Sequence, residues 1–211
     1  MNDIDLLMKY FPELTKEQQE LYIRFGELFR EWNEKINLVS RKDIDSLFEK
    51  HILHSLGIAK VIRFSPGTSI LDVGTGGGFP GIPLAICFPD VHFHLVDSIN
   101  KKLKVAHAIA AEIGLKNVTV HHTRAEDIKD KKFDVVVSRA VAPLKNLWYW
   151  SKPLLHKRPV HQAKRVTGLI CLKGGDLSKE IHESGLHPQV WEIENIFQEP
   201  FFKDKYILAV N

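Results

Sequence analysis

The chain has 211 residues, of which 44% are hydrophobic, and this is enough for one domain with a buried core. No apolar run approaches the roughly 20 residues of a membrane span, and the acidic start MNDIDLLMKY lacks the basic region of a signal peptide. Cys87 and Cys171 lie in apolar runs, so we expect buried free thiols and a cytoplasmic protein.

The net charge of +3 is distributed unevenly along the chain. Residues 1–97 hold 10 Lys or Arg and 14 Asp or Glu. Residues 176–211 hold 3 Lys or Arg and 7 Asp or Glu. Residues 98–175 hold 16 Lys or Arg but only 5 Asp or Glu. Such a concentration is typical of a surface that faces a polyanion, although solvated faces of ordinary surface helices would give the same count.

The first 64 residues have the pattern of helices. Apolar residues recur at helical spacing from Leu21 to Ile36, and Thr15 with Gln18 predicts a capping box at the start of that helix. A second helix is predicted over residues 44–56. The segment FSPGTS (64–69) then breaks the pattern. We therefore expect residues 1–64 to form a helical extension packed on a domain made of residues 65–211.

After residue 65, short β-rich runs alternate with helical segments. Runs at 69–73, 91–97, 117–122, 133–138 and 168–174 predict strands, and 188–197 with 205–211 predict a closing antiparallel pair. This order predicts an α/β, Rossmann-like fold with a mostly parallel seven-stranded sheet and an antiparallel closing strand. Ligands bind at the carboxyl ends of strands in such folds. That rule places six polar residues along one rim: Asp72, Asp97, Glu126, Ser138, Arg139 and Lys173.

A glycine-rich loop follows the first predicted strand in the stretch ILDVGTGGGFPG (70–81). Its G-x-G-x-x-G pattern is generic and also fits a nicotinamide dinucleotide or a plain tight turn. Phe79-Pro80-Gly81 stands where a P-loop needs Gly-Lys-Ser/Thr, so nucleoside triphosphate binding is excluded. Asp72, two residues before the first glycine, would repel a pyrophosphate but would suit a cofactor with cationic groups.

The spacing Asp72-x-Gly74-x-Gly76-x-Gly78 resembles the cofactor loop of Rossmann-like methyltransferases that use S-adenosylmethionine. Asp97 ends the next predicted strand, 19 residues past Gly78, where a carboxylate can accept the ribose hydroxyls. At the end of the third strand, Ala125 and Glu126 are placed to meet the adenine.

The fourth strand end carries Ser138-Arg139-Ala140-Val141. It lacks the Asn/Asp-Pro-Pro-aromatic motif of enzymes that methylate base amines, and no cysteine nucleophile lies near it. These absences favour an acceptor that is nucleophilic without deprotonation, such as guanine N7. Catalysis would then consist of alignment and charge management, without a general base.

From Trp32 to the last strand, the chain resembles the bacterial 16S ribosomal RNA methyltransferase G family, RsmG or GidB. The resemblance rests on NLVSRKD…KHILHSL, LDVGTGGGFPGIPLAI, LVDSINKK, RAED, SRAVAPL and LKGG, in this order. It implies methylation of guanine N7 in the decoding-region loop of small-subunit rRNA, with S-adenosylmethionine converted to S-adenosylhomocysteine. It also implies 16S rRNA or the small ribosomal subunit as partner, and we take a monomer as the default state.

The motifs, the resemblance and the basic charge of residues 98–175 together suggest roles for two sets of residues. The cofactor set is Asp72, Gly74, Thr75, Gly76, Gly78, Phe79, Asp97, Ser98, Ala125, Glu126 and Arg139, with Arg139 also aligning the reactants. The candidate RNA set is Arg124, Lys101, Lys102, Lys157, Arg158, Lys164, Arg165 and Lys173, four of them in the basic segment 156–168. Each basic residue has the alternative of a solvated side chain without a partner.

Two positions depart from the family pattern, since Phe79 replaces a common leucine and His54 a common aspartate. His51 and His54 are spaced i, i+3, but no further ligands accompany them, so we expect packing and no metal site. Two alternatives stay open: a methyltransferase for another RNA, a protein or a small molecule, and a nicotinamide-binding sensor module.

Overall fold

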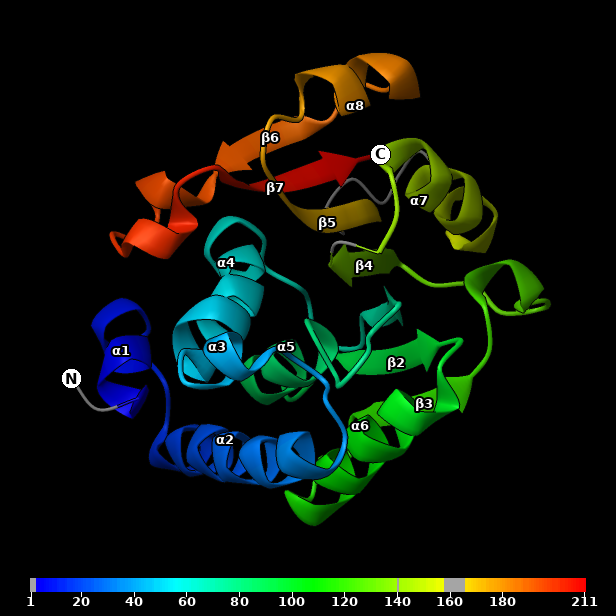
Figure 1. Ribbon diagram of the computed structural model, residues 1–211. Coiled ribbons are helices and arrows are strands. Elements are labelled where there is room, and N and C mark those ends of the chain that lie inside the picture. The colour runs from blue at the N-terminus through cyan, green and yellow to red at the C-terminus, as the bar shows by residue number, and fades with distance from the viewer. Residues whose placement is uncertain (1–2, 140, 158–165) are drawn as a thin grey trace.

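The computed structural model describes residues 3–139, 141–157 and 166–211 (Figure 1). Within these ranges a seven-stranded sheet has the order β3-β2-β1-β4-β5-β7-β6. β1 to β4 pair in parallel, as do β4 and β5, whereas β7 runs antiparallel to both β5 and β6. The expected mostly parallel α/β sheet with an antiparallel closing strand is therefore confirmed. The strands are β1 (Ser69–Val73), β2 (His92–Asp97), β3 (Val118–His122), β4 (Val135–Arg139), β5 (Gly168–Gly174), β6 (Gln189–Glu192) and β7 (Lys205–Val210).

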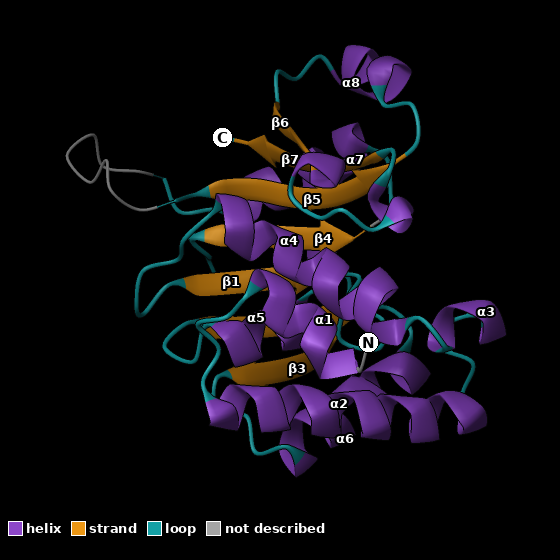
Figure 2. Ribbon diagram, turned by 90° about the vertical axis from the view of Figure 1, so that its left-hand side faces the viewer, coloured by secondary structure: helices purple, strands orange, loops and turns teal. Residues whose placement is uncertain are grey.

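Helices cover both faces of the sheet (Figures 1 and 2). One face carries α1 (Asp3–Tyr10), α2 (Lys16–Lys35), α3 (Arg41–Ile44), a π-helical turn (Phe48–Leu53), α4 (His54–Val61), α5 (Gly81–Cys87) and α6 (Asn100–Glu112). The other face carries α7 (Leu144–Ser151) and α8 (Ser178–Ser184). Successive strand residues alternate between the two cores, as Ile70 and Leu71 illustrate.

The N-terminal helices share one hydrophobic core with the sheet. The capping box of α2 is present, because Gln18 N donates to Thr15 Oγ1 at 3.2 Å and Thr15 N donates to Gln18 Oε1 at 3.0 Å. The buried Tyr22 hydroxyl donates to the Pro83 carbonyl at 2.8 Å and thereby ties α2 to α5. The predicted helix over 44–56 is instead a π-helical turn that continues into α4. A domain boundary at residues 64–65 stays a prediction.

The parallel register aligns the strand ends that carry the polar residues. Val73 of β1 pairs with Val96 on one side and with Ser138 on the other. Asp97 and Arg139, the last residues of β2 and β4, therefore flank the loop that follows β1. In the described part of the chain, no helix has the length and apolar character needed to cross a membrane.

Candidate active site

A cavity of about 480 Å³ opens at the carboxyl ends of β1 to β4. Most of the predicted cofactor residues line it: Gly74, Thr75, Gly76, Phe79, Asp97, Ser98, Ala125, Glu126 and Arg139. Its size lies in the range of small-molecule sites, about 300–1,000 Å³. Residues that were predicted at four separate strand ends therefore lie around one cavity in the structure.

The glycine loop brings bare backbone to the cavity wall. Gly74 N and Thr75 N both donate to the Val96 carbonyl, at 2.9 and 3.1 Å, so the loop turns across the end of β2. Gly74 has a φ of +71°, and a Cβ there would lie 2.3 Å from Val141 Cγ1. Only glycine fits this position, because both the backbone conformation and the space exclude a side chain.

Asp72 lies beneath the loop and does not line the cavity. It is fully buried, and its Oδ2 accepts the Thr75 hydroxyl at 2.6 Å and Gly81 N at 2.8 Å. Burial raises the pKa of Asp72 to about 7, although the bonds from Thr75 and Gly81 lower it. The expectation that Asp72 faces the cationic groups of a cofactor is therefore corrected. Its carboxyl group joins the two ends of the glycine loop, and Gly78 is likewise absent from the lining.

Asp97 is the carboxylate that reaches the cavity. Its Oδ2 accepts Gly76 N and its Oδ1 accepts Ile99 N, both at 2.8 Å, so two backbone amides fix its orientation. Each carboxylate oxygen has a second lone pair, and the side chain stays partly exposed. Asp97 can thus accept two more hydrogen bonds, which is what a ribose with two hydroxyls requires.

Arg139 forms the opposite wall. Its Nη1 donates to His51 Nδ1 at 2.9 Å, and its Cζ lies 4.7 Å from the centroid of the Phe79 ring. Burial lowers the pKa of Arg139 to about 10, while Asp72 and Asp43 act in the opposite direction, so the guanidinium stays cationic at neutral pH. Phe79 itself packs edge-on against Phe29, with ring centroids 5.0 Å apart.

The candidate RNA residues separate into several locations. Lys102 and Arg124 line the cavity, and Lys101 is exposed nearby on α6. Lys157 is exposed, but it follows His156, whose N donates to the carbonyl of Phe133 just before β4 begins. Lys157 therefore lies at the amino ends of the strands, opposite the cavity. Arg158, Lys164 and Arg165 fall outside the described residues.

Lys173 is not the exposed rim residue that the sequence suggested. Its side chain is only 8% exposed, and its Nζ forms an ion pair with Glu180 Oε1 at 2.7 Å and donates to the Ala142 carbonyl. Since two oxygens already occupy this ammonium, it is not presented to an RNA phosphate. Ser138 is also buried, with its hydroxyl donating to the Val73 carbonyl at 2.8 Å.

Sequence reasoning missed several residues of the wall. Phe29 comes from α2, Leu38 and Val39 come from the connection between α2 and α3, and Trp150 comes from α7. Asn33 gave a usable signal, because it is a polar residue beside an apolar helical stripe. It is buried, and its Oδ1 accepts Leu38 N at 2.8 Å and Val39 N at 2.9 Å. Trp150 gave no signal that distinguishes it from a core aromatic.

His51 and His54 occupy different environments. The His54 ring packs against Phe201 and Phe202, with centroids 5.7 and 6.1 Å away, as expected for a packing histidine. His51 instead contacts Arg139 and Phe79. Among the residues that the structure describes, no cluster of three His, Cys, Asp or Glu side chains is arranged to hold a metal ion.

Comparison with known proteins identifies the family of the chain that forms this cavity. The family model described as rRNA small subunit methyltransferase G matches residues 18–203. The chain belongs to this family. A ribosomal RNA small subunit methyltransferase G from Phocaeicola vulgatus is 53% identical over 207 residues, which cover 98% of each chain. The corresponding protein from Cytophaga hutchinsonii is 48% identical and is covered over 99% of its length.

Solved structures support the methyltransferase fold of this family member. A SAM-dependent methyltransferase from Aquifex aeolicus has a TM-score of 0.52 at 18% identity, covering 78% of this chain and 92% of that one. The ribosomal protein L11 methylase from Lactobacillus delbrueckii has a TM-score of 0.53 at 18% identity, covering 75% and 76%. Family membership makes the protein a methyltransferase, and the likeness to these structures shows that its fold is Rossmann-like.

Proposed function

We propose that the protein transfers a methyl group from S-adenosylmethionine to N7 of a guanine in the decoding-region loop of 16S rRNA. The observation that carries this proposal is the composition of the cavity. Its lining includes both the Asp97 carboxylate and the Arg139 guanidinium, and no histidine or cysteine lies among its described lining residues. Such a wall can orient two reactants, whereas it offers no thiol nucleophile and no imidazole base.

The described residues fit the two ends of the donor. Asp97 and the segment Ala125–Glu126, at the ends of β2 and β3, would hold the adenosine part. The glycine loop and Arg139, at the ends of β1 and β4, would then hold the methionine part. The donor supplies a methyl group on a sulfonium, and the loop residues Gly74, Thr75 and Gly76 line the cavity where that end would lie.

The reaction needs no proton transfer. The N7 lone pair of guanine attacks the methyl carbon while the bond between carbon and sulfur breaks, and that electron pair stays on sulfur. The products are neutral S-adenosylhomocysteine and a cationic 7-methylguanine. The protein contributes by holding both reactants in line, which is the contribution expected of a preorganised site.

RNA is the acceptor class that the charge distribution supports. Lys102 and Arg124 stand at the cavity, and exposed Lys101 continues the basic surface along α6. We further infer that the protein acts as a monomer in the cytoplasm, where its two free cysteines, Cys87 and Cys171, would stay reduced.

The deciding experiment incubates the purified protein with methyl-labelled S-adenosylmethionine and small ribosomal subunits from cells that lack it. We expect label in 16S rRNA at one guanosine, with strand cleavage after borohydride and aniline treatment that marks N7. Label at another atom, or in ribosomal protein, would contradict the proposed acceptor. Tight binding of NADH without binding of S-adenosylhomocysteine would instead support a nicotinamide-binding module.

A further inference from the structure

His51 contacts the cavity wall without lining the cavity itself. It lies in the π-helical turn Phe48–Leu53, and π-helical turns occur frequently at functional sites. We propose that His51 is a positioning residue that holds the guanidinium of Arg139 toward the methionine end of the donor. This inference deepens the proposed function and rests on it.

Two contacts define the position of Arg139, and a third joins the two residues that make them. His51 Nδ1 accepts its Nη1 at 2.9 Å, and the Phe79 ring lies under its Cζ at 4.7 Å. The His51 and Phe79 rings also touch each other, with centroids 5.3 Å apart. The arginine head is thus enclosed on one face and on one edge. Among the described residues, His51 is the one that accepts a hydrogen bond from this guanidinium. We infer that other N–H groups of Arg139 bind an anion, and the carboxylate of the donor is the anion that the methionine end would bring.

The bond requires a neutral His51. Arginine can only donate, so Nδ1 must be unprotonated and the ring proton must lie on Nε2. Burial, followed by the positive charge of Arg139, lowers the pKa of His51 to about 3, against an opposing effect of Asp43. His51 is therefore an acceptor throughout the neutral range, and it fixes an arginine without adding a second positive charge.

His54 provides a matched control on the next turn of the helix. It is buried, whereas His51 is partly buried, and its ring packs on Phe201 and Phe202 with no hydrogen bond to Arg139. A change at His54 therefore perturbs the same helical segment without removing the bond that the proposal concerns.

The test compares three variants, His51→Leu, His51→Asn and His54→Leu, by calorimetric titration with two ligands. S-adenosylhomocysteine carries the amino-carboxylate, and 5′-methylthioadenosine lacks it. We expect His51→Leu to weaken S-adenosylhomocysteine binding about tenfold, the scale of one hydrogen bond to a charged group, and to leave methylthioadenosine binding unchanged. His51→Asn, whose Oδ1 can replace Nδ1, should restore most of the affinity, and His54→Leu should bind both ligands normally.

Several outcomes would overturn the proposal. Equal weakening of both ligands in His51→Leu would indicate a structural role, and unchanged affinity for S-adenosylhomocysteine would show that Arg139 does not depend on His51. An Asn variant no better than Leu would exclude the hydrogen bond. If the wild type bound neither ligand, the proposed function would fail instead. The bond itself would still be readable from the ¹⁵N shifts of the His51 ring, which should change on Arg139→Met.

Discussion

Two aspartates near the ends of neighbouring strands show how burial gives the same side chain different roles. Asp72 has no exposed surface and its Oδ2 is occupied by Thr75 and Gly81, so it stabilises the loop. Asp97 is held by two backbone amides but stays partly exposed, so it keeps hydrogen-bonding capacity for a ligand. The same chemical group thus serves structure in one place and recognition in the other.

Replacement of Asp97 by alanine should weaken S-adenosylhomocysteine binding strongly. Two hydrogen bonds from ribose hydroxyls to a carboxylate would be lost, each worth about 1.5–3 kcal/mol. Asp97→Asn, which keeps one acceptor oxygen, should fall between alanine and wild type. Isothermal titration measures all three affinities, and an alanine variant with unchanged affinity would remove Asp97 from the ribose.

At the scale of elements, the connection from α2 to α3 forms part of the cavity wall. Asn33, in the last turns of α2, accepts the backbone amides of Leu38 and Val39, and both of these residues line the cavity. An amide side chain therefore gives an irregular segment a defined path over the site. Through this connection, the N-terminal part of the chain supplies lining residues to a cavity at the strand ends.

Asn33→Ala should release this segment. Two partly buried amides would lose their acceptor, and we expect a loss of about 1–3 kcal/mol in the free energy of unfolding, with several-fold weaker S-adenosylhomocysteine binding. Asn37→Ala is the matched control, since Asn37 is exposed in the same connection. Urea denaturation and calorimetry give the two quantities, and equal behaviour of the two variants would contradict the role of Asn33.

The sequence predicted those elements whose signal is local. Glycine spacing, alternating strands and the capping box at Thr15 each depend on a few neighbouring residues, and the structure contains all three. The burial of Lys173 depends on Glu180 in α8, and the role of His51 depends on Arg139, 88 residues away in sequence. Such pairs form only when the chain folds, so spacing could not reveal them.

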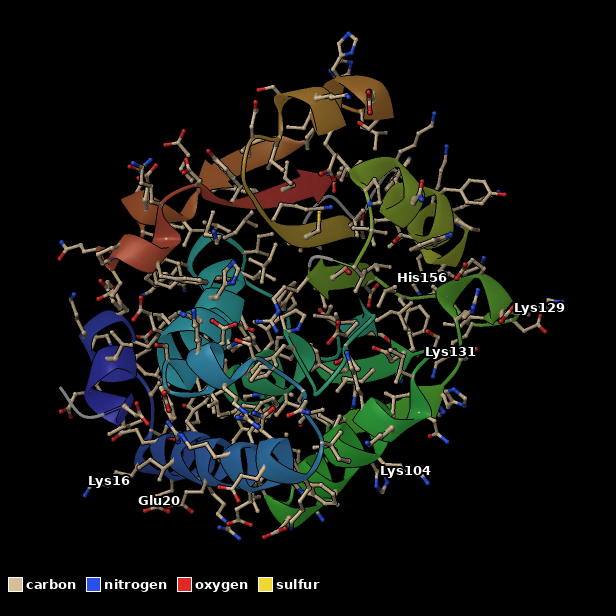
Figure 3. The ribbon with its side chains drawn as sticks, in the orientation of Figure 1. Lys16, Glu20, Lys104, Lys129, Lys131 and His156 are labelled. Atoms are coloured by element: carbon tan, nitrogen blue, oxygen red, sulfur yellow. The ribbon has the colours of Figure 1, made fainter. Side chains whose placement is uncertain are left out.

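At the scale of the whole molecule, positive charge gathers on one flank. Among the described residues, none of the basic side chains from α6 to the connection between β3 and β4 forms an ion pair with a carboxylate. Figure 3 shows Lys104, Lys129 and Lys131 on this side, while Lys16 and Glu20 lie on α2 at the other side. Lys102 and Arg124 bring this charge to the cavity, whereas Lys129 and Lys131 lie in the segment that leads to the amino end of β4. The basic flank therefore runs from the cavity rim along this side of the molecule, and unpaired charge of one sign is suited to an RNA backbone.

Charge reversal on this flank should weaken RNA binding and spare the donor site. The triple variant Lys104→Glu, Lys129→Glu, Lys131→Glu changes exposed side chains that do not line the cavity. Each phosphate contact that is lost should reduce the slope of log affinity against log salt by about 0.7–0.9. Filter binding to 16S rRNA at several salt concentrations measures that slope for the triple variant and for each single variant.

Lys16→Glu makes the same charge change on the exposed surface of α2 and should bind RNA as the wild type does. If Lys16→Glu weakened RNA binding as much as Lys104→Glu, net charge alone would explain the effect. A triple variant with wild-type slope would place the RNA on another face.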